Sequence, residues 1–259
     1  MIDENIQLNL RKKYNPDGSE LRTKQLALLE MLKYIDKVCK EQKIKYWLAS
    51  GSCLGAIRHG GFIPWDDDID IELLEEDYNK LIAYLQTHPT DNYILQTHKN
   101  DENYLMDFVK LRDRKTKVKE ILGFDINYKY SGLFIDIFKL SPSNSKFLHY
   151  ICARLRILEL YCKLWSNRNG GVKCIFSVLR SFDNFLIKIC KYLDRIGAKG
   201  QLRHSLGIPF LKPRFKSDVD NITHVLFEGY LFPVPANYDA YLRNLYGEYH
   251  VIVNDHSHF

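Results

Sequence analysis

The sequence lacks several features that would assign it to a class directly. Its six cysteines include no C-x-x-C pair, so we expect reduced thiols in a cytoplasm rather than a disulfide framework. A zinc site built from the last four cysteines is disfavoured, because their spacing matches no common zinc finger. The N-terminal residues lack the pattern of a secretion signal. No run approaches the roughly 18 consecutive apolar residues that a membrane span requires.

What the chain does have is a large apolar fraction and an uneven charge. It contains 259 residues, of which 46% are hydrophobic, and this excludes disorder and supplies one sizeable core. Between Lys146 and Lys216 there are 15 Lys and Arg against three acids, a net charge of +12, which leaves −7 for the rest of the chain. The sequence therefore predicts an acidic body that carries a basic insert.

Apolar spacing predicts long helical regions over residues 17–42, 147 to about 207 and 238–245. The first begins with Asp17 and Glu20, which form the D-x-x-E pattern of a capping box. The second is interrupted at Gly170-Gly171. The third is expected to end at Gly247 in the left-handed conformation.

Strands are predicted over residues 44–48, 65–73, 93–96, 106–112 and 133–140. The segment 65–73 alternates, with Ile69 and Ile71 on one face and acids, including Glu72, on the other. The segment 133–140 is apolar on both faces, so we expect it at the centre of a sheet.

An acidic block from Asp66 to Asp77 contains eight acids in twelve residues and no Lys or Arg. Its last three acids fall in the first turn of a predicted helix, where the helix dipole favours anions. On a strand, residues two apart lie on one face about 6.6 Å from each other, so Asp68 and Asp70 can share a divalent ion. Carboxylate ligands select Mg²⁺ or Mn²⁺ over zinc. Asp66 lies on the same face and is a further candidate ligand, whereas Asp67 points away.

Two other segments complete this candidate site. Gly51-Ser52 opens a short helix, with Ser52 as its expected N-cap, and its free backbone N–H groups can bind a phosphate. Asp136 stands alone in the apolar segment LFIDIFKL, where a carboxylate is costly to bury unless it is paired or bound to a metal. The structural alternatives are a hydrogen-bonded core aspartate at Asp136 and a polar loop at Asp68 and Asp70.

Three basic residues are weaker candidates for binding phosphate. Lys110 and Arg112 share one strand face and could clamp phosphate oxygens, or they could be exposed surface residues. Arg58 lies between the two halves of the site and could contact phosphate, or it could cap the end of the short helix.

These motifs resemble those of the nucleotidyltransferase superfamily and, more closely, of the LicD family of phosphocholine transferases, which are relatives of fukutin. The segments that carry the resemblance are GSCLGAIRHGGFIPWDDDID (51–70), KLRDRKT (110–116), GLFIDIFKL (132–140) and FEGYLFPVPANYDAYLRNLYGEY (227–249). The resemblance implies an α+β fold with a nucleotidyltransferase-like mixed sheet flanked by helices and a basic helical insert. We expect a core over residues 1–145, the insert over 146–216 and a C-terminal segment over 217–259 that packs back on the core.

The resemblance also implies an activity: metal-dependent transfer of phosphocholine from CDP-choline to a sugar hydroxyl of a surface glycan, of the lipopolysaccharide or teichoic-acid type, with release of CMP. Asp68, Asp70 and Asp136, with Asp66, would hold Mg²⁺ or Mn²⁺, and Asp136 could instead act as the general base. The donor's phosphate would lie near Gly51 and Ser52. Choline is a quaternary ammonium, so its pocket should contain aromatic rings.

Alternatives remain open at this point. The donor could carry another polyol phosphate such as ribitol phosphate, or the reaction could be nucleotidyl transfer. A catalytically silent nucleic-acid or membrane-binding module is the alternative outside enzymes, although we expect no nucleic-acid partner. The basic insert is either a helical lobe with a basic outer face or a surface that docks on anionic lipid at the inner face of the cytoplasmic membrane, where a lipid-linked acceptor waits.

Overall fold

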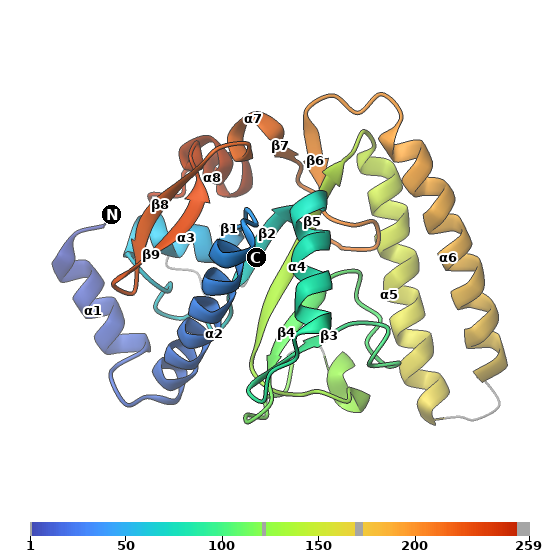
Figure 1. The fold of residues 1–259 in the computed structure, drawn as a ribbon, viewed down its shortest axis with the longest axis horizontal. Helices are drawn as coiled ribbons and strands as arrows, with labels where there is room; N and C mark the ends of the chain where they lie inside the picture. Colours follow the sequence, from blue (N-terminus) through green and yellow to red (C-terminus); the bar gives the residue numbers. More distant parts are fainter. Residues whose placement is uncertain (1, 121–122, 169–172, 253–259) are drawn as a thin grey trace.

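The fold is built around one long strand. The computed structural model describes residues 2–120, 123–168 and 173–252 and has the expected α+β composition (Figure 1). The central strand is β5 (Phe134–Pro142), which pairs in parallel with β2 (Asp70–Leu74) and antiparallel with β4 (Val109–Asp113). The other strands of this mixed sheet are β1 (Trp47–Leu48), β3 (Tyr93–Gln96), β6 (Gln201–Arg203) and β7 (Arg214–Phe215). The central position predicted for 133–140 is confirmed.

Two helices cover one face of the sheet. α2 (Glu20–Gln42) and α4 (Glu75–Thr87) lie in front of the strands in Figure 1 and contact β5. Leu32 and Ile35 of α2 are fully buried in the same hydrophobic core as Ile135 and Ile137 of β5. Because side chains alternate along a strand, Asp136 points to the opposite face. The three acids in the first turn of α4 are confirmed as a helix start.

The strand in the acidic block begins later than the alternation of apolar and acidic residues over 65–73 predicted. β2 begins at Asp70, and residues 65–69 form a turn and a loop. The carbonyl oxygen of Asp66 accepts a hydrogen bond from Gln25 Nε2 at 2.8 Å, so a side chain of α2 replaces a neighbouring strand there. Glu72, predicted on an acid-lined face, is fully buried.

The predicted helix start at Asp17 is wrong. Ser19 is the N-cap of α2, because its side chain accepts a hydrogen bond from the backbone N–H of Arg22 at 3.1 Å. An earlier helix, α1 (Glu4–Tyr14), precedes it and is capped by Asp3. The short helix is α3 (Ser50–His59), whose N-cap is Ala49 rather than Ser52.

A C-terminal hairpin packs against α3 and was not predicted. Its strands are β8 (Ile222–Phe227) and β9 (Tyr230–Pro235), and the turn residues Glu228 and Gly229 have φ angles of 51° and 82°. A residue followed by glycine between two apolar runs is the signal that could have revealed it. The Glu228 carboxylate accepts hydrogen bonds from Arg22 at 2.7 Å and from the backbone N–H of Phe62 at 3.2 Å. Glu228 therefore ties the hairpin to the core.

Two further helices lie on either side of this hairpin in the sequence, α7 (Lys216–Val219) before it and α8 (Tyr238–Tyr246) after it. α8 stops at Gly247 as predicted, although the angles of that glycine, φ 70° and ψ −125°, are not those of the left-handed helix. A 3₁₀ turn, η1 (Phe124–Asn127), connects β4 to β5.

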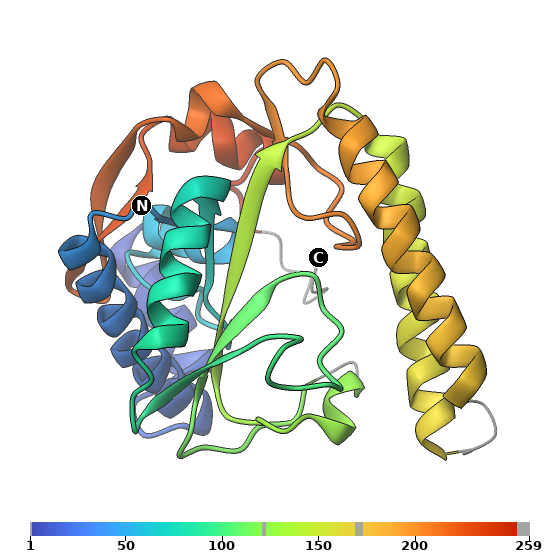
Figure 2. The same ribbon diagram turned by 45° about the vertical axis from the view of Figure 1, so that its right-hand side comes forward.

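The basic segment contains a pair of long helices. α5 (Lys146–Arg168) and α6 (Lys173–Arg195) lie side by side at one edge of the molecule (Figure 2). The helical prediction is wrong beyond Arg195, because β6 and β7 follow and join the sheet through β5. The predicted break at Gly170-Gly171 lies outside the described residues. No helix in the described ranges combines the length and apolarity needed to cross a bilayer.

Glycine substitutions within α3 and just after it test how closely this helix packs. A Cβ at Gly55 would lie 2.5 Å from the backbone carbonyl oxygen of Gly61. A Cβ at Gly61 would meet the end of the Glu228 side chain, which Arg22 holds but which can yield more readily than backbone. Replacing a helical glycine by alanine ordinarily stabilises a helix by up to about 1 kcal/mol. We expect Gly55→Ala instead to lower the free energy of unfolding by about 1–3 kcal/mol, and more than Gly61→Ala does. Urea denaturation measures both, and the reverse order would contradict this packing.

Candidate active site

A row of polar side chains crosses the sheet on the face away from α2 and α4. The strand register places Asp70 beside Asp136, Asp136 beside Lys110, and Lys110 beside Gln96. Neighbours in register point to the same side of a sheet, so the two aspartates of β2 and β5 are adjacent. Asp68 lies in the loop just before β2. The sequence predicted this meeting of Asp70 and Asp136.

The aspartates of this row form an anionic cluster with Asp66 and Asp68. Burial, followed by Asp68 and Asp136, raises the pKa of Asp70 well above its usual value. Burial, followed by Asp66 and Asp136, does the same to the pKa of Asp68. The pKa of Asp66 is raised to about 6, first by burial and then by Asp67. Asp67 itself is exposed, as its predicted orientation required.

Lys110 supplies positive charge to this cluster. Its Nζ lies 3.0 Å from Asp136 Oδ1 and 3.4 Å from Glu120 Oε2, and it is 3.3 Å from the ring centroid of Phe134. Burial raises the pKa of Asp136, and Lys110 opposes that rise. The side chain of Lys110 is only 3% exposed, so the alternative that it is a surface residue is wrong.

The start of α3 lies against the cluster, although its contacts differ from the predicted ones. The Ser52 side-chain oxygen accepts a hydrogen bond from the backbone N–H of Asp70 at 2.9 Å, so it ties α3 to β2. A Cβ at Gly51 would lie 3.0 Å from Asp66 Oδ2, so a glycine here leaves room for that carboxylate. The structure thus brings Gly51 and Ser52 to the carboxylates.

Both arginines that were candidates for binding phosphate instead have protein partners. Arg112 is fully buried and donates to Gln96 Oε1 at 2.7 Å, to the Gly132 carbonyl oxygen at 2.9 Å and to Glu120. The alternative prediction that Arg112 is an exposed surface residue is also wrong. Arg58 is buried and donates to the carbonyl oxygen of Tyr249 at 2.9 Å. Because these guanidinium groups are already engaged, we assign both arginines to holding the fold rather than to binding phosphate.

A second buried carboxylate on β2, Glu72, was not singled out from the sequence. Its Oε1 lies 2.8 Å from His204 Nε2 and 2.7 Å from Arg214, and its Oε2 accepts hydrogen bonds from Trp47 at 3.1 Å and from Tyr241 at 3.0 Å. Burial raises the pKa of Glu72, but Arg214 and then His204 outweigh burial, so the pKa is lowered to about 2.

Tyr241 extends this network to the start of α3. Its hydroxyl oxygen accepts a hydrogen bond from the backbone N–H of Ser50 at 3.1 Å. Ser50 has a φ of 46°, an unusual value for a residue other than glycine, and such strain persists only where the surroundings enforce it. Glu72 therefore positions the start of α3 through Tyr241.

The residues of the cluster fit a hard divalent cation. Four half-buried carboxylates repel one another, and among the described residues the ammonium of Lys110, 3.0 Å from Asp136 Oδ1, is the one cation paired with them. No three His, Cys, Asp or Glu side chains of the described ranges are already arranged as a ligand set. Carboxylates that repel each other separate when no cation holds them together. The donor set is the one that suits Mg²⁺ or Mn²⁺.

A mixed sheet that gathers carboxylates beside a lysine and a helix start is an arrangement suited to enzymes that act on phosphate groups. Comparison with known proteins agrees. Residues 43–153 match the family described as LicD/FKTN/FKRP, nucleotidyltransferase domain.

Curated relatives extend the match beyond this domain. The chain is 28% identical to the lipopolysaccharide cholinephosphotransferase LicD of Haemophilus influenzae over 249 residues, covering 88% of this chain and 91% of that protein. It is 47% identical to the human ribitol 5-phosphate transferase FKRP over 51 residues, covering 20% of this chain and 10% of FKRP. It is 39% identical to the mouse ribitol-5-phosphate transferase FKTN over 49 residues, covering 19% and 11%. Residues 43–153 are therefore similar to the LicD/FKTN/FKRP nucleotidyltransferase domain, and most of the chain is similar to a cholinephosphotransferase, which supports an enzyme of the phosphotransferase class.

Removing the charge of Glu72 tests its structural role. We expect Glu72→Gln to lower the free energy of unfolding by about 3–5 kcal/mol, because Arg214 would remain buried without its anionic partner. Tyr241→Phe removes one hydrogen bond to the same carboxylate and should cost about 1 kcal/mol. Both are measured by chemical denaturation. A Glu72→Gln variant as stable as the wild type would contradict the assigned role.

Proposed function

We propose that this protein transfers phosphocholine from CDP-choline to a sugar hydroxyl of a cell-surface glycan of the lipopolysaccharide or teichoic-acid type, releasing CMP. The observation that carries the proposal is the cluster of Asp68, Asp70 and Asp136 on a mixed sheet, in a chain whose residues 43–153 match the LicD/FKTN/FKRP nucleotidyltransferase domain. The relative that aligns with most of the chain is named for cholinephosphotransfer to lipopolysaccharide. The reaction would take place in the cytoplasm.

In this proposal Asp68, Asp70 and Asp136, with Asp66, hold Mg²⁺ or Mn²⁺. When bound, the cation would neutralise the negative charge of the donor's diphosphate. Lys110 lies within the row and can pair with a phosphate oxygen once a cation engages Asp136. In the alternative in which Asp136 is not a ligand, it takes the proton of the acceptor hydroxyl, because Lys110 keeps it in its charged form.

Aromatic rings flank the proposed reaction centre. Phe138 follows Asp136 by two residues on the same face of β5 and packs against Phe108, with ring centroids 4.7 Å apart. The ring of Phe134, on the other side of Asp136, faces Lys110. A quaternary ammonium binds on aromatic faces, so Phe108 and Phe138 are the candidates for choline.

Ribitol phosphate is the second candidate for the transferred group. The human and mouse relatives with local identities of 47% and 39% are named as ribitol 5-phosphate transferases. A thermal-shift screen of CDP-choline, CDP-ribitol, CTP and ATP, with and without Mg²⁺, separates the donors, because a ligand that binds only the folded protein raises its melting temperature. Affinity for RNA that survives EDTA and falls with salt would instead indicate the nucleic-acid-binding alternative.

Replacing two carboxylates tests the catalytic proposal. We expect the double variant Asp68→Asn and Asp70→Asn to stay folded and to consume CDP-choline more than about 1000-fold more slowly, because it lacks the ligands that neutralise the diphosphate. CMP release in the presence of Mg²⁺ is the measurement.

The matched control is Asp67→Asn, which changes the exposed aspartate between Asp66 and Asp68. Its rate should remain within about threefold of the wild type, because exposed charges are screened by solvent. Equal losses in the control and the double variant would point to general damage. Full activity in the double variant would refute the proposed site.

We further propose that α6 rests on an anionic membrane surface. One face of α6 is apolar and exposed; it comprises Val178, Phe182, Phe185, Ile189 and Tyr192, which are 42–72% exposed. Lys188 and Arg195 lie beside this face, and the two acids of α6, Asp183 and Asp194, are buried. An apolar helical face with a basic border suits the interface of an anionic bilayer.

Vesicle binding tests this surface. We expect the wild type to co-sediment with vesicles that contain phosphatidylglycerol but not with pure phosphatidylcholine vesicles. Phe182→Asp with Phe185→Asp should abolish binding, because it places charge on the apolar face. Leu226→Asp, at a residue of β8 that is 56% exposed, is the control and should bind normally. Binding that is lost equally in the control, or kept in the α6 variant, would refute the assignment.

A further inference from the structure

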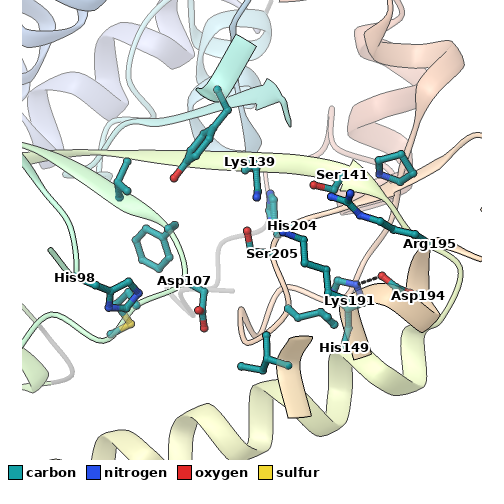
Figure 3. A pocket seen from close by; sticks show the side chains of 17 residues that line it. His98, Asp107, Lys139, Ser141, His149, Lys191, Asp194, Arg195, His204 and Ser205 are labelled. Carbon is teal, nitrogen blue, oxygen red and sulfur yellow. Dashed lines mark hydrogen bonds and ion pairs between the residues drawn. The ribbon is translucent and has the colours of Figure 1, made fainter. Parts of the chain in front are cut away.

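A cavity of about 260 Å³ lies between β5 and the α5–α6 pair (Figure 3). It occurs along β5 between the last pairing with β4, at Ile137, and the first pairing with β6, at Ser141. The chain before β4, the start of α5, the end of α6 and the segment after β6 complete its wall. His204 belongs to that wall and stacks on Phe138 at 4.8 Å, which brings the cavity next to the proposed reaction centre.

The cavity has more positive charge than its acids balance. Lys139, Lys191 and Arg195 line it, and all three share one carboxylate, Glu75. Arg195 contacts both Glu75 oxygens, at 2.7 and 2.6 Å, whereas Lys139 is 3.4 Å and Lys191 4.0 Å from Oε1. Burial, followed by Lys139, lowers the pKa of Lys191. Three cations that share a single carboxylate keep an excess positive charge, which a bound anion would balance.

The acids on the cavity wall have other partners and do not offset these cations. Asp107 is engaged by Arg156, at 2.7 and 3.1 Å. Asp194 accepts hydrogen bonds from Ser143 and from the backbone N–H groups of Asn144 and Ser145, and it lies 2.9 Å from His149 Nε2. The charge of each is therefore satisfied before any ligand enters.

Unpartnered polar atoms belong to the same wall. Ser141 Oγ, His149 Nδ1 and His204 Nδ1 are buried and make no hydrogen bond to any described residue. Buried polar atoms without partners are uncommon in folded proteins, and three in one cavity indicate a polar ligand or ordered water. This observation is independent of the excess of positive charge.

We propose that this cavity binds a phosphate group of one of the two substrates, held between Lys139 and Lys191 with Arg195 at its mouth. A phosphate offers several acceptor oxygens with a charge close to −2, which matches two ammonium groups, a guanidinium and the Ser141 hydroxyl. The phosphate belongs either to the CDP-linked donor or to a phosphorylated acceptor glycan. The choice of source depends on the transfer reaction proposed above, but binding of the anion does not.

Inorganic phosphate is the probe for the binding step. Its affinity is measured by calorimetry in the presence of EDTA, so that the carboxylate cluster cannot take part through a divalent cation, with sodium chloride at matched ionic strength as the reference. We expect the wild type to bind phosphate and Lys139→Met with Lys191→Met to bind it at least about tenfold more weakly. Lys191→Met alone should lose less phosphate affinity. Because this side chain is 49% exposed, the single variant should fold even if the double variant does not. Lys188→Met, on the same helix but outside the cavity, should bind like the wild type.

Steady-state kinetics then identify the source. A rise in KM for the acceptor alone assigns the phosphate to the glycan, and a rise in KM for the donor alone assigns it to CDP-choline. The site is refuted if the wild type binds no phosphate, if only an effect of ionic strength is seen, or if all four proteins bind equally. If the lysine variants lose phosphate binding but keep both KM values unchanged, the cavity has no role in the reaction. If no CDP-linked donor is consumed at all, the proposed function fails while the binding result still decides the site.

Discussion

The site depends on one buried carboxylate, Glu72, more than on any other single residue. It lies two residues from Asp70 on β2 and receives donors from β1, from the segment after β6, from β7 and from α8. These elements are far apart in the sequence, and a buried anion is tolerated only when several such donors converge on it. The same carboxylate fixes Tyr241, which in turn holds Ser50 at the start of α3. The C-terminal part of the chain thus reaches the candidate site through a single charge.

Glu72 also clarifies what distinguishes the functional acids. All five acids of this region are wholly or largely buried, yet Glu72 has a pKa lowered to about 2 whereas Asp66, Asp68, Asp70 and Asp136 have pKa values that are raised. The difference is the supply of positive charge: Glu72 has Arg214, while in the cluster of four aspartates Lys110 pairs with Asp136. Carboxylates that the protein buries together without balancing them are suited to an external cation. Burial alone would not distinguish a structural carboxylate such as Glu72 from carboxylates that can bind a cation.

The sequence predicted the parts of the site that depend on local patterns. Asp70 and Asp136 meet because each belongs to an apolar strand, and strand periodicity is visible in sequence. Arg58 and Arg112 were interpreted as phosphate ligands because their partners, the Tyr249 carbonyl oxygen and Gln96, lie 191 and 16 residues away. Glu72 was overlooked because it continues the alternation of Asp68 and Asp70, and only His204 and Arg214, more than a hundred residues later, distinguish it. Local pattern identifies a charged residue, but its partners decide whether that charge is structural or available.

α6 contributes both to the proposed membrane-binding surface and to the cavity next to β5. Its exposed apolar side faces solvent, its buried side carries Asp194, and Lys191 and Arg195 line the cavity next to β5. If the apolar side lies on a bilayer, the mouth of the cavity at Lys191 and Arg195 lies close to the headgroup layer, because one helix is only about 10–12 Å across. A phosphate attached to a lipid-linked glycan would then reach the cavity without leaving the membrane surface, while CDP-choline enters from the aqueous side. This geometry favours the acceptor over the donor as the source of the phosphate, because the donor's diphosphate is already matched to the carboxylate cluster and its cation.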